Sequence, residues 1–315
     1  MGREMNRRTW ASRLPAAAIG VWAASFGVEA EAQVAAQPLR VVASFSVLAD
    51  MVREVGGDAV AVSGLVGPDA DAHVFEPSPR DAQRLANADL VVVNGLRFEG
   101  WIERLIQASG YRGPVVTATR GITPRLLGSE PDPHAWQSLV NARRYVENIR
   151  VALVAARPAL ATQINQRSAD YGRRIDALEA STRMRLQRIA VADRRVVTSH
   201  DAFGYFADSY GVTFVHAQGW TTGTEASAAD VAGIVRQLKT QKVRALFVEN
   251  ITDPRLVQRI AREAGARVGG TLYSDALSPP GTAGDTYLRM FEHNVATLLA
   301  ALQPATQAGT PASTR

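Results

Sequence analysis

Apolar and polar positions along the chain alternate between two kinds of segment. Short apolar runs of strand length are followed by longer stretches with apolar residues at helical spacing, as in residues 79–87 and 101–109. In the first half of the chain, strands are predicted at residues 39–43, 60–66, 90–93 and 115–118. Strands that alternate with helices predict a parallel sheet with crossover helices.

The same pattern starts again in the second half of the chain. Strands are predicted at residues 195–199, 212–215, 245–248 and 268–273, and helices at residues 202–210, 228–241, 254–264 and 286–302. The predicted fold is therefore α/β, with two lobes that each contain a mainly parallel sheet flanked by helices. We place the N-terminal lobe in residues 33–157 and the C-terminal lobe in residues 191–302.

The centre of the chain has no strand pattern. Pro158 is expected to divide residues 135–190 into two helices, because proline is tolerated in a first turn but not in a helix interior. The second helix, in residues 158–190, is polar on most faces and about 45 Å long at 1.5 Å per residue. We expect it to link the lobes as a backbone helix, although an exposed helix packed on one lobe would have the same pattern.

Both ends of the chain are predicted to lie outside the two lobes. Four arginines lie in residues 1–13, residues 14–28 carry no charge, and Ala30-Glu31-Ala32 matches a small-x-small cleavage site. The apolar run is shorter than the roughly 20 residues of a membrane anchor, which is the alternative. Residues 1–32 are therefore predicted to be a cleaved signal peptide, and the Ala-, Thr- and Pro-rich residues 303–315 a flexible tail.

Composition narrows the chemistry that the chain can perform. The 315 residues include 35 Lys and Arg, 30 Asp and Glu, five His and no Cys, with a net charge of +5. The lack of Cys excludes disulfides, Cys-ligated metal sites, a Cys nucleophile and a lipid anchor on Cys. The charge excess is small and no Lys/Arg run exceeds two residues, so nucleic-acid binding is not expected. No later segment approaches 18 apolar residues, so we expect a soluble protein, exported to the periplasm.

Four loops that follow predicted strands each carry a potential metal ligand. They contain His73, His134, His200 and Asp275, two in each half of the chain. Loops at the carboxyl ends of parallel strands bind ligands in α/β proteins, so the four side chains can meet in a cleft between the lobes. Three imidazoles and one carboxylate suit Zn²⁺. On spacing alone, each imidazole is also compatible with a surface residue or a hydrogen-bonded structural residue.

The same residues bear on whether the site is catalytic. No His-x-x-x-His pair lies on a predicted helix, so the common metalloprotease signature is absent. A catalytic zinc keeps one coordination position open, whereas four protein ligands close the site. A closed site favours holding the ion, and no enzymatic activity is expected.

Four acidic residues near these loops are candidates for supporting roles. Glu76 and Asp201 neighbour two of the imidazoles in sequence and are expected to accept their N–H groups. Glu249 ends a strand and is expected to brace the interface between the lobes. Asp132 is expected to hydrogen-bond to the local backbone and is not counted as a ligand.

Nine stretches of the chain resemble one known family, the metal-binding (zinc/manganese) solute-binding proteins of ABC importers, called cluster A-I. They are VVASFSVLAD (41–50), HVFEPSP (73–79), VVNGLRFEGW (92–101), DPHAW (132–136), VTSHDAFGYF (197–206), TGTEASAAD (222–230), FVENITDP (247–254), SDA (274–276) and TYLRMFEHN (286–294). The resemblance covers nearly the whole chain after the signal peptide. It implies metal ligation by His73, His134, His200 and Asp275, and a long helix between two lobes.

The family resemblance also implies a function. The chain is expected to be a periplasmic receptor that captures Zn²⁺ and delivers it to an ABC-transporter membrane permease. Manganese-importing members often carry Glu at the third ligand position, so His200 favours zinc over manganese. A manganese or iron receptor is the alternative within the family; a metallohydrolase or an adhesin with the same fold and His/Asp cluster is the alternative outside it. Further expectations are a monomeric state and a periplasmic metallochaperone as a second partner.

The chain departs from the family pattern at three places. Residues 121–133 contain no His where many zinc members have a His-rich loop, so a secondary acquisition site is not expected. The lack of Cys excludes the C-terminal-lobe disulfide of many zinc members. After Trp136 the chain continues Gln137-Ser138-Leu139, where the family often has a Leu-Asp-Pro-like stretch.

Overall fold

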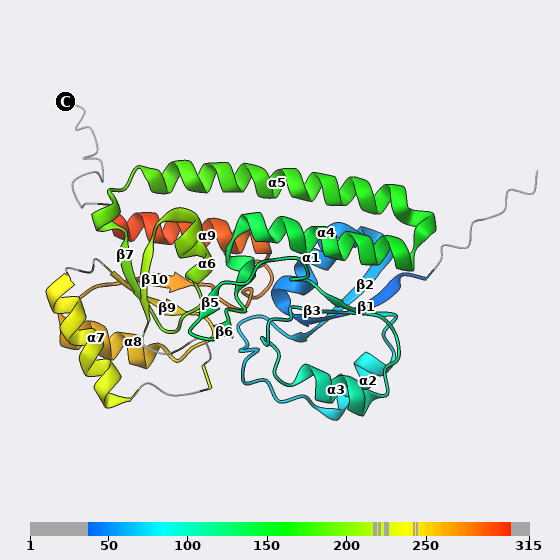
Figure 1. The fold of residues 1–315 in the computed structure, drawn as a ribbon, viewed down its shortest axis with the longest axis horizontal. Coiled ribbons are helices and arrows are strands. Elements are labelled where there is room, and N and C mark those ends of the chain that lie inside the picture. Colours follow the sequence, from blue (N-terminus) through cyan, green and yellow to red (C-terminus); the bar gives the residue numbers. More distant parts are fainter. Residues whose placement is uncertain are drawn as a thin grey trace, which may run out of the picture. The chain divides into compact units, whose positions relative to one another are not determined.

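The computed structural model describes two α/β lobes joined by a long helix, as the sequence predicted (Figure 1). It describes residues 37–303, except 217, 218, 220, 221, 224–226, 242 and 244. The predicted signal peptide and residues 304–315 of the predicted tail lie outside the described residues. Within the described part of the chain, no helix has the length and apolar content needed to cross a bilayer.

The N-terminal lobe is built on a four-stranded parallel sheet. Its strands are β1 (Leu39–Phe45), β2 (Val60–Val66), β3 (Leu90–Val93) and β4 (Val115–Thr117), in the order β2-β1-β3-β4. Helices α1 (Ser46–Gly56), α2 (Pro79–Ala86) and α3 (Ile102–Ser109) connect them. Figure 1 shows α1 on one side of the sheet and α2 and α3 on the other.

The C-terminal lobe repeats this topology. Its strands are β7 (Arg195–Thr198), β8 (Thr213–His216), β9 (Ala245–Glu249) and β10 (Val268–Leu272), all parallel in the order β10-β9-β7-β8. Its helices are α6 (Gly204–Tyr210), α7 (Ala228–Gln241), α8 (Pro254–Ala264) and α9 (Tyr287–Leu302). In each lobe the first strand in the chain pairs with the second strand on one side and with the third strand on its other side. The connections therefore diverge at β1/β3 and at β7/β9, where sheets of this kind bind ligands.

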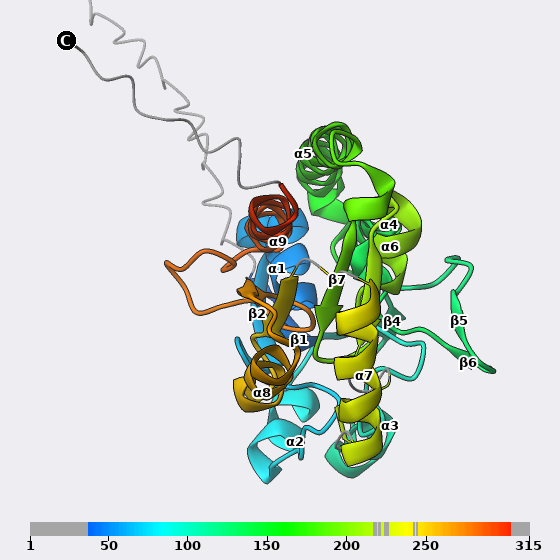
Figure 2. The same cartoon turned by 90° about the vertical axis from the view of Figure 1, so that its left-hand side faces the viewer.

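Two long helices occupy the centre of the chain. They are α4 (Leu139–Ala156) and α5 (Ala161–Gln187), and the single 3-10 turn Pro158–Leu160 separates them, as predicted for Pro158. The 27 residues of α5 give a length of about 40 Å. This helix packs against α1 and α4 in one lobe and against α6 and α9 in the other (Figures 1 and 2). The main apolar core continues through these helices, and a smaller cluster lies under α7 and α8.

Local sequence determines where α2 begins, and with it the end of the loop that carries His73. The Ser78 side chain accepts the backbone N–H of Asp81, while the Asp81 carboxylate accepts the backbone N–H of Ser78 at 2.9 Å. Pro79 occupies the first turn, where its missing N–H costs nothing. This capping box fixes the point at which the loop after β2 becomes helix.

Helix α1 and the hairpin at residues 126–131 were not predicted. Helix α1 follows β1 directly, and nine of its eleven residues are buried, so the apolar run is continuous and its period does not distinguish helix from strand. A short antiparallel hairpin joins β5 (Leu126–Leu127) to β6 (Glu130–Pro131) through Gly128, whose φ is 64°. This hairpin projects away from the sheets (Figure 2).

Candidate metal centre

The four candidate ligands meet between the lobes. His73 follows β2, His134 follows β6, His200 follows β7 and Asp275 follows β10. Each offers one potential ligand atom, and these atoms all lie within 4.8 Å of one another. The structure therefore brings together all four residues singled out from the sequence.

The Asp275 carboxylate lies at the centre of the cluster. Its Oδ2 is 3.1 Å from Nε2 of His73 and 3.1 Å from Nε2 of His200, and its Oδ1 is 3.7 Å from Nε2 of His134. The Nε2 atoms of His73 and His134 are 3.3 Å apart. A tetrahedral zinc with bonds of about 2.0–2.2 Å has ligand atoms about 3.3–3.6 Å apart. The separations in the cluster are close to those of such a site.

The cluster is closed to solvent. The His73 side chain is 2% exposed, and those of His134, His200 and Asp275 are 0% exposed. A buried carboxylate is costly unless its oxygens have partners. Asp275 Oδ1 accepts no hydrogen bond from the residues described. A cation held by the cluster would satisfy this oxygen.

Two further carboxylates contact the outer nitrogens of the imidazoles. Asp132 Oδ1 is 2.8 Å from Nδ1 of His134, and Glu249 Oε2 is 2.6 Å from Nδ1 of His200. The same two carboxylates accept the backbone N–H of His134 at 3.0 Å and of His200 at 2.9 Å. A carboxylate at Nδ1 favours the tautomer protonated there, which leaves the Nε2 lone pair directed into the cluster.

These carboxylates differ from the acceptors that the sequence predicted. Glu76 is exposed, and Asp201 instead pairs with Nε2 of His216 at 3.2 Å. Glu249 lies 49 residues from His200 in sequence but ends β9, the strand beside β7. Asp132 does bond to the local backbone as expected, and its contact with the imidazole is additional. The sequence signal for Glu249 was an acidic residue at the carboxyl end of a predicted strand, the same end that carries the candidate ligands.

Formal charges around the cluster do not balance when the imidazoles are neutral. Asp132, Glu249 and Asp275 are all 0% exposed. The one guanidinium that reaches them is that of Arg125, whose Nη1 is 3.2 Å from Asp132 Oδ2, among the residues described. The buried network therefore has two uncompensated negative charges, which is the charge that a divalent cation neutralises.

Without metal, protons on the imidazoles provide this charge. Burial lowers the pKa of His134, but Asp275 and Asp132 outweigh burial and raise it to about 9. The pKa of His200 is also raised well above its ordinary value, because Glu249 and Asp275 outweigh burial. Burial alone would raise the pKa of Asp275, yet the two imidazoles hold it well below the ordinary value. Burial lowers the pKa of His73, so an ion held by the cluster would displace protons mainly from the other two imidazoles.

The ligand loops of the two lobes are also hydrogen-bonded to each other. Nε1 of Trp136 and Nε2 of Gln137 both donate to the carbonyl of Ser274, at 2.9 and 2.7 Å. Tyr287 donates its hydroxyl to the carbonyl of Trp136 at 2.6 Å. The three bonds are buried, and they connect the segment after His134 to the residue before Asp275 and to α9, so they hold the lobes together beside the cluster.

This arrangement suits binding of an ion more than chemistry on a substrate. Four protein groups converge within 4.8 Å, so a four-coordinate ion held by all of them would have no position left for water or substrate. The cluster lies between two lobes of equal topology, joined by a long helix that contacts both. These features define a two-lobe metal-binding receptor.

Comparison with known proteins identifies the family. Residues 41–301 match the family described as ZnuA, zinc-uptake complex component A, periplasmic. The chain belongs to this family, whose members are metal-binding substrate-binding proteins of ABC transporters and not enzymes.

Related proteins are named for three different metals. Iron-binding protein YfeA of Yersinia pestis is 33% identical over 268 residues, which cover 84% of this chain and 86% of that protein. Manganese-binding lipoprotein MntA of Bacillus subtilis is 32% identical over 287 residues, which cover 88% and 94%. The structure of the periplasmic zinc-binding protein TroA from Treponema pallidum matches with a TM-score of 0.82 and 30% identity, covering 85% of this chain and 100% of that one. The family therefore establishes metal binding, and the metal is a separate question.

Proposed function

We propose that the chain captures Zn²⁺ between its lobes and delivers it to the permease of an ABC importer. The proposed ligands are Nε2 of His73, His134 and His200 and the carboxylate of Asp275. The geometry of the cluster carries this proposal: its buried ligand atoms all lie within 4.8 Å of one another, and four contacts among them measure 3.1–3.7 Å. Such spacing supports one four-coordinate ion.

The ligand types support zinc over manganese or iron. Imidazole nitrogens suit Zn²⁺, whereas Mn²⁺ prefers sites rich in carboxylate, carbonyl and water oxygens at higher coordination number. Three of the four ligands are imidazoles here, and the third position of the family pattern is His200. Manganese and iron receptors are the alternatives, as the names of the relatives indicate.

We place the receptor in the periplasm. The predicted signal peptide, residues 1–32, supports export, and the family description names the same compartment. In this proposal residues 33–157 and 191–302 are the lobes that hold the ion, and residues 158–190 link them. The receptor acts as a monomer and obtains zinc from solution or from a periplasmic metallochaperone.

Delivery requires the lobes to separate at the cluster. The hydrogen bonds from Trp136 and Gln137 to Ser274 must break in that movement, together with the bonds between the ion and one lobe. We propose that contact of the permease with both lobes drives their separation.

Metal analysis of the purified protein tests the choice of metal. Protein isolated from the periplasm should contain one zinc per chain by mass spectrometry. Zinc should also displace manganese and ferrous iron in equilibrium competition. One equivalent of manganese or iron, retained against zinc, would assign the chain to the alternative receptors. A protein without measurable affinity for any of the three would favour an adhesin that keeps the fold.

A further inference from the structure

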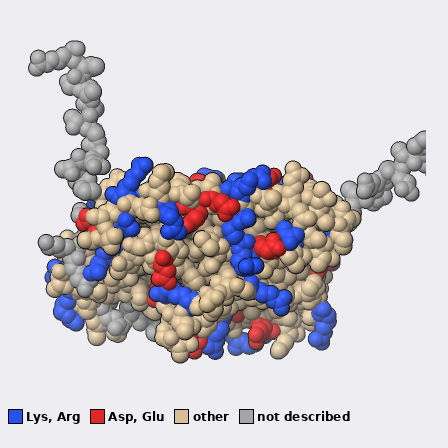
Figure 3. All heavy atoms as spheres, turned by 45° about the horizontal axis from the view of Figure 1, so that its top comes forward, with Lys and Arg blue, Asp and Glu red and all other residues tan. Residues whose placement is uncertain are grey.

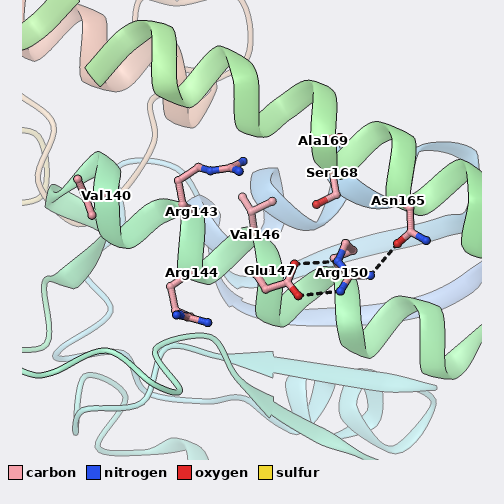
Figure 4. A pocket seen from close by; sticks show the side chains of 9 residues that line it. All are labelled: Val140, Arg143, Arg144, Val146, Glu147, Arg150, Asn165, Ser168 and Ala169. Carbon is pink, nitrogen blue, oxygen red and sulfur yellow. Dashed lines mark hydrogen bonds and ion pairs between the residues drawn. The ribbon is translucent and has the colours of Figure 1, made fainter. Parts of the chain in front are cut away.

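A groove between α4 and α5 has no part in the metal site. Its volume is about 620 Å³, and it is lined by residues of these two helices (Figure 4). None of the four candidate ligands lines it. The groove has a basic character, because three arginines of α4 and one glutamate line it.

Two arginines, seven residues apart on one face of α4, reach across to α5 at separate points. Arg150 donates to both oxygens of Glu147 at 2.8 and 2.7 Å and to Oδ1 of Asn165 on α5 at 2.7 Å. Arg143 lies against α5 at Gly172, where an added Cβ would overlap its guanidinium. The glycine therefore makes room for a cation at one end of the groove, while Arg150 is fixed by its partners at the other.

Several donors around the groove have no partner among the residues described. Nε of Arg143 is 3.3 Å from Asp176, whose side chain is 62% exposed, but its two terminal nitrogens donate no hydrogen bond there. Arg144 forms no ion pair with the described residues. Ser168 is 6% exposed, and its hydroxyl likewise has no hydrogen-bond partner in the described part of the chain. Figure 4 shows the Ser168 hydroxyl and the Arg143 guanidinium directed into the space between the helices.

We infer that this groove binds one phosphate-type oxyanion. Guanidinium N–H groups donate in pairs to tetrahedral oxyanions, and a hydroxyl beside them adds a third donor. Arg143 and Ser168 supply these donors, and Arg144 adds positive charge. Basic and acidic side chains are interspersed over the face that carries α5 (Figure 3), so the charge suits a small anion better than an extended polyanion. Inorganic phosphate and the phosphate of a lipid headgroup share this chemistry.

Titration of inorganic phosphate into the metal-free protein tests the inference. We expect saturable binding of one equivalent by calorimetry at low ionic strength. Arg143→Gln should weaken it about tenfold or more, the cost of one charge-assisted hydrogen bond, and Ser168→Ala by about three- to tenfold. Arg144→Gln should cause a smaller loss. Arg104→Gln on α3 is the matched control, since Arg104 is exposed and outside the groove, and should bind like the original chain.

A second variant separates geometry from net charge. Gly172→Ala keeps every charge but displaces the Arg143 guanidinium, so phosphate binding should weaken although the net charge is unchanged. Sedimentation with phosphatidic acid vesicles, against phosphatidylcholine vesicles, distinguishes a lipid headgroup from free phosphate. Binding in either arm that Arg143→Gln weakens about tenfold or more and Arg104→Gln leaves unchanged supports the inference. No binding in either arm, or an equal loss in Arg104→Gln, would overturn it. The melting temperature of each variant reports whether it is folded. Zinc affinity is a second check, because none of the substituted residues belongs to the candidate metal cluster.

Discussion

Replacing Glu249 with Gln changes the support of one candidate ligand without removing the ligand. Glu249 faces His200 with both oxygens: Oε2 is 2.6 Å from Nδ1, and Oε1 accepts the backbone N–H at 2.9 Å. A carboxylate has an acceptor oxygen for each, whereas an amide has one acceptor and one donor. In Glu249→Gln, one His200 donor must therefore face an NH₂ group, or the imidazole must move its proton to Nε2.

Both outcomes weaken metal binding. A proton on Nε2 occupies the lone pair that the ion needs. If the Nδ1–H instead faces the NH₂ group, the two donors repel each other, the ring rotates, and the Nε2 lone pair points away from the cluster. Loss of a group that orients a ligating imidazole typically costs about 10- to 100-fold in metal affinity, or about 1.4–2.7 kcal/mol. His200 and Glu249 are 0% exposed, so no solvent replaces the lost acceptor, and we expect a loss near the upper end.

Competition with a chromophoric zinc chelator at fixed pH measures this loss. Glu263→Gln is the control, because Glu263 lies on α8 of the same lobe with its side chain 44% exposed and paired to Arg259. The control should bind zinc like the original chain. If Glu249→Gln binds zinc as tightly as Glu263→Gln, the reasoning that a carboxylate at Nδ1 prepares His200 for the ion is wrong.

Three other outcomes are expected. The pKa of His134 is about 9 in the metal-free protein, so protons must leave on binding, and zinc affinity measured by competition should rise with pH until about pH 9; a flat profile would exclude this coupling. Burial raises the pKa of Asp50 to about 6, so its contribution to stability is present below about pH 4 and lost as pH rises through 6. This loss is worth about 3 kcal/mol in the free energy of unfolding, and Asp50→Asn should remove it when urea unfolding is compared at pH 4 and pH 7. If the free energies at the two pH values differ as much in Asp50→Asn as in the original chain, the reasoning is wrong. Tyr287→Phe removes the bond to the Trp136 carbonyl and should lower the free energy of unfolding by about 1–2 kcal/mol, whereas unchanged stability would mean that the bond contributes nothing.

Much of the fold could be predicted because the strands are short and bounded. All four residues of β3 are buried, and polar or turn residues limit the run on both sides, so its length alone favours a strand. The proline at position 158 has one acceptable place, the first turn of a new helix, and therefore marks the break before α5. Helix α1 has neither a marked boundary nor a proline at its start, because its apolar residues continue those of β1. It is also buried on nearly all of its faces, so no broad exposed face marks it as a helix.

The candidate ligands could be found in the sequence more readily than the carboxylates that contact them. Each candidate ligand is a polar residue in a loop after a strand, which is a local property of the sequence. The position of Glu249 beside His200 depends instead on β9 pairing with β7, and the order of strands in a sheet is not visible in an apolar pattern. Gln137 is a similar case, since its donation to Ser274 requires the second lobe to be in place.

Zinc titration of ligand variants addresses whether this cluster holds the transported ion. The original chain should bind one Zn²⁺. His134→Ala and His200→Ala should each weaken binding by more than about 100-fold, beyond the usual cost of losing a supporting group. His293→Ala is the matched control, because His293 contacts the Thr271 carbonyl at 3.0 Å outside the cluster, and its affinity should not change. Zinc affinity that survives intact in His134→Ala or His200→Ala would show that the ion is held elsewhere.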